Sequence, residues 1–148
     1  MMDVLIYESG NGGELSLRNG DIETTDSLAN QAYLSHFGGN VEASTIGNEI
    51  ESEQRRDWYG NSLLDVNAQM NSELERALNA NELGSLGRSN IERAALKDIQ
   101  HLSDLADIAS TAKITGNNKI NITDKIDKTV ADIIWDSTKN ELIYEITI

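Results

Sequence analysis

The chain contains no cysteine and no proline, and aromatic residues make up only 5% of its 148 residues. The absence of cysteine excludes disulfides, thiolate zinc sites and cysteine nucleophiles. So few aromatic side chains leave little material for the aromatic-lined cleft in which a glycosidase buries its acid. The fold must therefore depend on its hydrophobic core or on neighbouring subunits.

Basic residues are also scarce. The chain has 12 Lys+Arg and 25 Asp+Glu, which gives a formal net charge of −13. This surplus repels phosphate backbones, so we expect no nucleic-acid partner. No apolar run approaches the roughly 20 residues that cross a bilayer, and the first residues lack the pattern of a signal peptide. We therefore expect no membrane association and a soluble protein made in a cytoplasm.

The hydrophobic pattern predicts a single α+β domain over residues 1–148, with a mostly antiparallel sheet packed by two to three helices. An N-terminal hairpin and helix are expected over 3–46, an Arg/Trp loop over 47–64, helices over 69–106 and C-terminal antiparallel strands over 107–148. The pair Asn19-Gly20 predicts a hairpin over 14–24, because both residues accept the positive φ of a type I′ turn. A further strand is expected over 40–46.

Three helices are predicted from capping signals. Thr25 or Asp26 is expected to cap a helix that ends at Gly38-Gly39. Two capping boxes, at 72–75 and 89–92, predict the starts of two further helices, with Gly84 and Gly87 interrupting the helical pattern between them. The last helix has an apolar stripe, and its charged side chains are expected to face outward. The stripe comprises Ile91, Ala95, Ile99, Leu102 and Ala106, and the outward residues are Arg93, Lys97 and Asp98.

The last third of the chain alternates with period two. One apolar face and one polar face are what an antiparallel sheet half covered by helices requires. The predicted apolar face consists of Ile108, Ala112, Ile114, Ile120, Ile122, Ile126, Ala131, Ile133, Trp135, Leu142, Tyr144, Ile146 and Ile148.

Signals for catalysis or cofactor binding are weak. His36 and His101 lie on separate predicted helices, and a solvated or helix-terminal position is favoured over a metal ligand for each. The glycines at 10–13 lead into a predicted strand, so no helix N-terminus faces a phosphate there. The segment 136–140 begins like a calcium loop but lacks the required glycine and bidentate glutamate. We expect no enzymatic activity, no cofactor, no metal and no small-molecule substrate.

One segment stands out as a candidate binding site. Arg55, Arg56, Trp58 and Tyr59 lie within five residues of an otherwise acidic, aromatic-poor chain. Arginine, tryptophan and tyrosine dominate binding hot spots, because they bury a large area and keep a polar group available. Alternatively, Trp58 fills the core and the arginines pair with nearby carboxylates such as those of residues 51 and 53. Both interpretations remain open from the residues alone.

The same segment carries a family resemblance. An apolar N-terminal strand, Gly20-Asp21-Ile22, a helix and the sequence from Arg55 to Ser62 resemble the small baseplate wedge proteins of Mu-like contractile-tailed phages and prophages. That family's loop reads Arg-Arg-Gly-Trp-Trp-Gly-Asp-Ser. Here Asp57, Tyr59 and Asn61 replace the glycine, the second tryptophan and the aspartate.

The resemblance implies a structural protein that joins the wedge core to the tail sheath by protein–protein contacts. Its partners would be other baseplate wedge subunits and the tail sheath protein. It would be located in the virion tail baseplate, after assembly in the bacterial host cytoplasm. The resemblance also implies a compact α+β domain with terminal strands that mimic the strand-exchange element of the sheath.

The terminal strand over 141–148 is long and apolar on one face. It is expected either to complete the sheet of this domain or to add to the sheet of a neighbour through its exposed edge. The candidate partner-binding residues are therefore Arg55, Arg56, Trp58, Tyr59, Leu142, Tyr144 and Ile146.

A free-standing acidic binding or inhibitor protein of the cytoplasm is the alternative function. The charge of −13 suits a protein that masks a basic partner. The wedge fold is also similar to that of at least one family of anti-adaptors.

Overall fold

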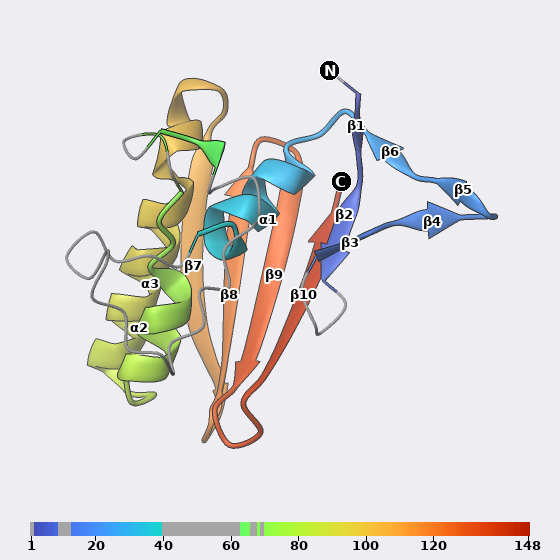
Figure 1. Cartoon of the computed structure of the whole chain (residues 1–148). Coiled ribbons are helices and arrows are strands. Elements are labelled where there is room, and N and C mark those ends of the chain that lie inside the picture. Colours follow the sequence, from blue (N-terminus) through green and yellow to red (C-terminus); the bar gives the residue numbers. More distant parts are fainter. Residues whose placement is uncertain (1, 9–12, 40–62, 66–67, 69) are drawn as a thin grey trace.

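The computed structural model describes residues 2–8, 13–39, 63–65, 68 and 70–148 (Figure 1). Within these ranges a four-stranded antiparallel sheet is covered on one face by helices, and an arm of short strands extends from the N-terminal side. This arrangement confirms the predicted α+β class with a mostly antiparallel sheet. The predicted strand over 40–46 and almost all of the Arg/Trp loop lie outside the described residues.

The sheet consists of the last four strands of the chain, in the order β10-β9-β8-β7. Their bounds are β7 (Ile108–Gly116), β8 (Lys119–Ile126), β9 (Thr129–Asp136) and β10 (Glu141–Thr147). Antiparallel pairing sets Ala112 opposite Ile122, and Ile122 opposite Ile133. Because side chains alternate along each strand, this register gathers the predicted apolar residues of the strands on one face. Ile148 is the exception, because it lies beyond the end of β10 and is exposed.

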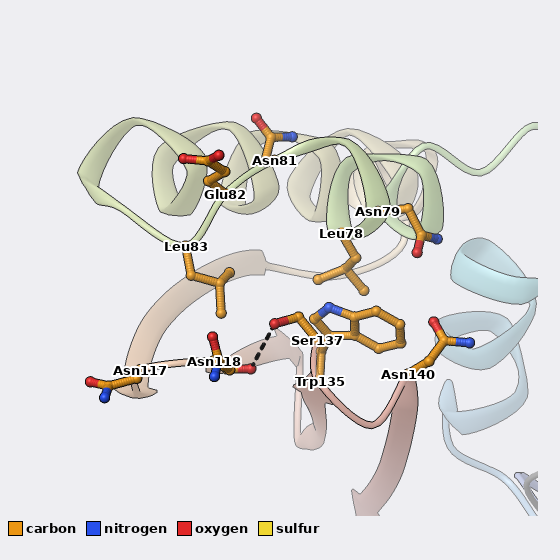
Figure 2. Close-up of a pocket in the computed structure, with 10 residues that line it drawn as sticks. All are labelled: Leu78, Asn79, Asn81, Glu82, Leu83, Asn117, Asn118, Trp135, Ser137 and Asn140. Atoms are coloured by element: carbon orange, nitrogen blue, oxygen red, sulfur yellow. Dashed lines mark hydrogen bonds between the residues drawn. The ribbon is translucent and has the colours of Figure 1, made fainter.

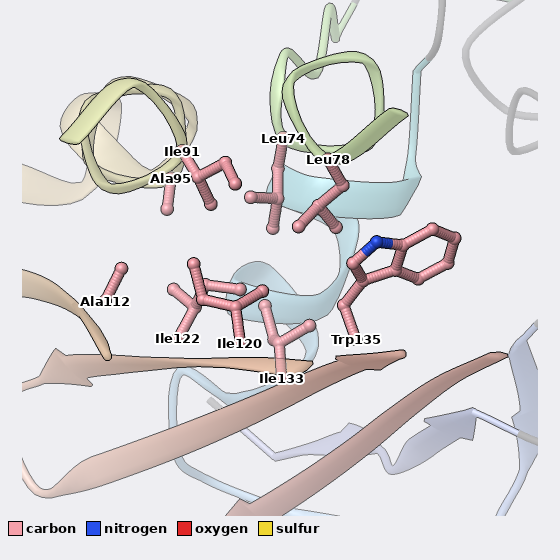
Figure 3. Close-up of a cluster of buried hydrophobic side chains, with 9 residues drawn as sticks. All are labelled: Leu74, Leu78, Ile91, Ala95, Ala112, Ile120, Ile122, Ile133 and Trp135. Carbon is pink, nitrogen blue, oxygen red and sulfur yellow. The ribbon is translucent and has the colours of Figure 1, made fainter. Parts of the chain in front are cut away.

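The main core lies between that face and two helices, α2 (Leu74–Ala80) and α3 (Ser85–Ile99) (Figure 3). Full burial of one isoleucine or leucine side chain contributes about 1.5–3 kcal/mol, so this layer is a major source of stability. Its buried members are Leu74, Leu78, Ile91, Ala95, Ala112, Ile120, Ile122, Ile133 and Trp135. None of the helices in the described ranges has the length and apolar character that a membrane span requires.

The first capping-box prediction is wrong. The N-cap of α2 is Glu73, and its side chain makes no cap hydrogen bond. Asp98 of α3 instead accepts hydrogen bonds from the backbone N–H groups of Glu73 (2.7 Å) and Leu74 (3.0 Å). The hydroxyl of Ser72 donates to the carbonyl of Ser35 at 2.7 Å. A side chain from another helix thus satisfies the free N–H groups that the local sequence was expected to satisfy.

The second capping-box prediction is also wrong, because the N-cap of α3 is Gly84, five residues before Ser89. Glu92 lies inside the helix, where its carboxylate accepts bonds from Arg88 (2.9 Å) and from the backbone N–H of Ala112 (2.8 Å). Gly87 does not interrupt this helix. A Cβ at position 87 would lie 1.9 Å from the carbonyl oxygen of Glu82, so glycine permits the close passage of the preceding turn. A 3₁₀ helix, η3 (Gln100–Asp104), continues α3.

The first helix, α1 (Ala29–Phe37), ends next to Gly38 as predicted, but its start differs in detail. Neither Thr25 nor Asp26 caps it. The hydroxyl of Ser27 accepts the N–H of Ala29 at 3.2 Å, and Thr25 in turn accepts the N–H of Ser27 at 3.1 Å.

The N-terminal arm is built from six short strands. Asn19 and Gly20 have φ values of 55° and 83°, so both adopt the left-handed conformation of a type I′ turn. The predicted hairpin is therefore confirmed. Figure 1 shows β4 and β5 extending away from the body of the molecule. The strands are β1 (Asp3–Val4), β2 (Ile6–Glu8), β3 (Gly13–Leu15), β4 (Leu17–Arg18), β5 (Asp21–Ile22) and β6 (Thr24–Thr25).

The end of α1 and the beginning of α2 meet in space. The backbone N–H of Ser72 donates to the carbonyl of Gly39 at 2.6 Å. The residue that follows the C-cap of α1 and the residue that precedes the N-cap of α2 are therefore held together by a backbone bond.

Candidate functional site

The outer part of the N-terminal arm exposes large apolar side chains. Leu15, Leu17 and Ile22 are 55%, 67% and 49% exposed. Leu17 and Ile22 are direct cross-strand partners, so their side chains lie next to each other across the hairpin. Exposed apolar residues are common singly, but a group of them on a projecting hairpin is typical of an interaction site.

The base of the arm is fastened to α1 by one buried asparagine. The side chain of Asn30 accepts the backbone N–H of Ile6 (3.0 Å) and donates to the carbonyl of Val4 (2.6 Å) and to Asp3 (3.0 Å). The hydroxyl of Tyr33 donates to Glu8 at 2.5 Å. Burial of that hydroxyl and the neighbouring negative charge of Glu8 raise the pKa of Tyr33. The base of the arm is thus held firmly while its outer hairpin projects.

We expect Asn30→Ala to lower the free energy of unfolding by about 1–3 kcal/mol, because it leaves the backbone groups of Ile6 and Val4 without partners. Urea denaturation measures this loss, and amide hydrogen exchange should show faster exchange in β2. Asn71→Ala is the matched control, because Asn71 is an exposed asparagine outside the arm. Equal stability of the two variants would contradict this role for Asn30.

The candidate residues of the terminal strand lie on the sheet edge. Leu142, Tyr144 and Ile146 are half-buried and face the same side as the core, and Leu142 and Tyr144 pack against it. Tyr144 also makes edge-on ring contacts with Tyr33 and Phe37. β10 therefore completes the sheet of this chain, and β2 lies beside it without a ladder of hydrogen bonds.

The other four candidates, Arg55, Arg56, Trp58 and Tyr59, lie outside the described residues. The choice between a core position and a binding position for Trp58 therefore stays open.

A buried charge cluster lies at the junction of the helices and the sheet. His36 of α1 is fully buried between Asp98 of α3 and Asp124 of β8. Its ring nitrogens lie 3.2 Å from Asp98 Oδ2 (Nδ1) and 2.5 Å from Asp124 Oδ2 (Nε2). Of the two positions predicted for His36, solvated or helix-terminal, the structure shows the helix-terminal one. The outward orientation predicted for Asp98 is wrong, because Asp98 is buried. His101, by contrast, is exposed, as predicted.

Electrostatics favour the charged form of this histidine. Burial by itself lowers the pKa of an imidazole. Hydrogen bonds to Asp124 and Asp98, together with their negative charges, outweigh burial and raise the pKa of His36 to about 9. His36 is thus an imidazolium at neutral pH that links two carboxylates from different elements.

This cluster has a structural rather than a catalytic geometry. Both ring nitrogens are engaged, and the side chain of His36 has no exposed surface. Within the described ranges, no group of histidine, aspartate and glutamate residues could hold a metal ion. Through these ion pairs and hydrogen bonds the cluster joins α1, α3 and β8, and Asp98 also binds the start of α2.

Comparison of the chain with protein-family models, with curated proteins and with solved structures gave no match.

Proposed function

We propose that this chain is a structural component of the baseplate wedge of a contractile-tailed phage or phage-tail-like particle. In this role it joins the wedge core to the tail sheath through protein–protein contacts and transforms no substrate. The observation that carries the proposal is the projecting apolar hairpin of the N-terminal arm, with Leu17 and Ile22 exposed on it.

The arm suits an assembly protein for a physical reason. The apolar side chains at its tip contribute little to the stability of the isolated fold, because they remain largely in water. Burial against a partner would remove that area from water at about 25 cal/mol per Å². The tight Asn19-Gly20 turn and the anchored base present the tip in a defined orientation, which lowers the cost of ordering on binding.

Two further features support the proposal. The family resemblance rests on residues 20–22 and 55–62, and it names the class of assembly. The strand β10 lies at an edge of the sheet, and the part of this edge that β2 does not flank is where a neighbouring chain could add a strand. Deletion of residues 142–148 would not test this second surface cleanly, because β10 pairs with β9 along its whole length.

The test uses an arm variant. We expect Leu17→Glu combined with Ile22→Glu to abolish assembled tails, because two charges would have to be buried at the contact. The measurement is the yield of sheathed particles from a prophage that carries the variant, together with co-purification of the large wedge subunit. Circular dichroism should show an unchanged fold, because both positions are exposed.

Leu105→Glu is the matched control, because Leu105 is 72% exposed but lies beyond η3, away from the arm. Particles should form at normal yield in this variant. Normal particle yield in the arm variant would overturn the proposed role of the arm. Co-purification of the unaltered chain with a single basic protein, in cells that make no tail proteins, would favour the acidic-inhibitor alternative.

A further inference from the structure

A polar pocket of about 480 Å³ lies between the C-terminal end of α2 and two turns at one end of the sheet (Figure 2). This volume falls within the roughly 300–1,000 Å³ of small-molecule sites. Five of the ten residues that line it are asparagines, and Glu82 is the one charged side chain among the ten. The pocket therefore presents mainly neutral amide groups.

Several of these amides are available to a ligand. Within the described part of the chain, the side chains of Asn117, Asn118 and Asn140 have no hydrogen-bond partner. Asn81 is different, because it donates to the carbonyl of Ala77 (2.7 Å) and accepts from Asn90 (3.0 Å). Figure 2 shows Asn79 and Asn81 on the helical side of the pocket, and on the sheet side Asn117 and Asn118 to the left of Trp135 and Asn140 to its right.

A left-handed backbone conformation explains the choice of asparagine at only one of these three positions. Asn140 has a φ of 51°, a left-handed conformation that asparagine tolerates better than most residues. Asn117 and Asn118 are not among the residues with positive φ. The backbone at these two positions therefore does not demand asparagine, and their side chains are available for another role.

The tryptophan of the pocket supplies an independent observation. Trp135 is 7% exposed, and its indole N–H is buried without an acceptor in the described residues. In both close-up views the nitrogen lies on the ring edge next to Leu78 (Figures 2 and 3). A buried donor without an acceptor is unfavourable, so this wall of the pocket carries a polar group that the described residues leave unsatisfied.

We propose that this pocket binds a neutral saccharide, with Asn117, Asn118 and Asn140 as its hydrogen-bonding side chains and Trp135 on its floor. The inference goes beyond the assembly role. It concerns binding alone and involves no hydrolysis. The chain therefore has a small-molecule ligand that its composition did not lead us to expect.

The chemistry of the lining selects this class of ligand. Each amide side chain donates and accepts at once, which matches a hydroxyl group that does the same. An anion would meet no basic side chain among the lining residues, and a cation would meet only the carboxylate of Glu82. Because so little of Trp135 is exposed, the specificity would come from the amides rather than from ring stacking.

The test is a titration of the full ¹⁵N-labelled chain with glucose, N-acetylglucosamine and its β-1,4-linked dimer. We expect at least one of these sugars to shift the indole signal of Trp135 and the side-chain signals of the three asparagines in a saturable way. Because the chain contains two tryptophans, comparison with Trp58→Phe assigns the signal of Trp135.

Asn118→Ala should weaken binding by about tenfold or more, since it removes hydrogen bonds to the ligand. Asn71→Ala is the matched control, because Asn71 is an exposed asparagine outside the pocket and should leave the affinity unchanged. The proposal is overturned if no sugar gives saturable shifts, if glycerol gives the same shifts, or if Asn118→Ala binds like the control.

Discussion

Replacement of His36 by alanine should lower the free energy of unfolding by about 3–5 kcal/mol, the cost of removing one member of a buried ion pair. The variant leaves Asp98 and Asp124 buried without their shared cation. Asp124 is the more affected of the two, because it is fully buried and its second oxygen already lacks a partner among the described residues. Urea denaturation followed by circular dichroism measures the loss.

His101→Ala provides the matched control, since it removes an exposed imidazole from the neighbouring 3₁₀ helix. We expect its effect to stay within about 1 kcal/mol. If the two histidine variants are equally stable, the cluster does not hold the helices to the sheet as described.

Stability should also fall as the pH rises through about 9. The pKa of His36 is raised from 6.5 to about 9 in the folded chain, so folding favours the protonated ring. Its contribution is complete below pH 6.5, where the ring is protonated in both states, and is lost as the pH rises through the folded pKa. A shift of this size corresponds to about 3 kcal/mol.

Urea denaturation between about pH 6.5 and pH 9.5 tests this dependence over the window set by the two pKa values. Measurement should stop there, because burial raises the pKa of Tyr33 and Tyr144, whose titration would add to the loss at higher pH. In His36→Ala this decrease in stability should be absent. A decrease of equal size in that variant would show that other groups cause it.

The strands of the sheet could be predicted because their information is local. Alternation of apolar and polar residues along 108–146 states which side chains face inward, and the register follows from short turns. The apolar stripe of α3 could be predicted for the same reason. Its members Ile91, Ala95 and Ile99 are all buried, as the helical spacing indicates.

The charge cluster could not be predicted in the same way, because its three members are far apart in sequence. One signal was present: Asp124 occupies an inward position between Ile122 and Ile126, where alternation leads one to expect an apolar residue. An aspartate at such a position requires a buried partner. Nothing local indicates that the partner is His36.

The helix starts were predicted wrongly for a related reason. Capping boxes describe how a helix satisfies its own first N–H groups. In α2 these groups instead donate hydrogen bonds to Asp98, which belongs to α3. The exposure of the arm was not predictable either. The Asn19-Gly20 turn specifies a hairpin, whereas the position of that hairpin outside the body depends on packing at its base.

The contact between Gly39 and Ser72 bears on how this protein can change over evolution. Because a backbone hydrogen bond joins the end of α1 to the residue before the N-cap of α2, the spacing of these two helices is set by residues of the body itself. Sequence change in either helix can therefore proceed without moving the end of α1 away from the start of α2, as long as this bond is kept.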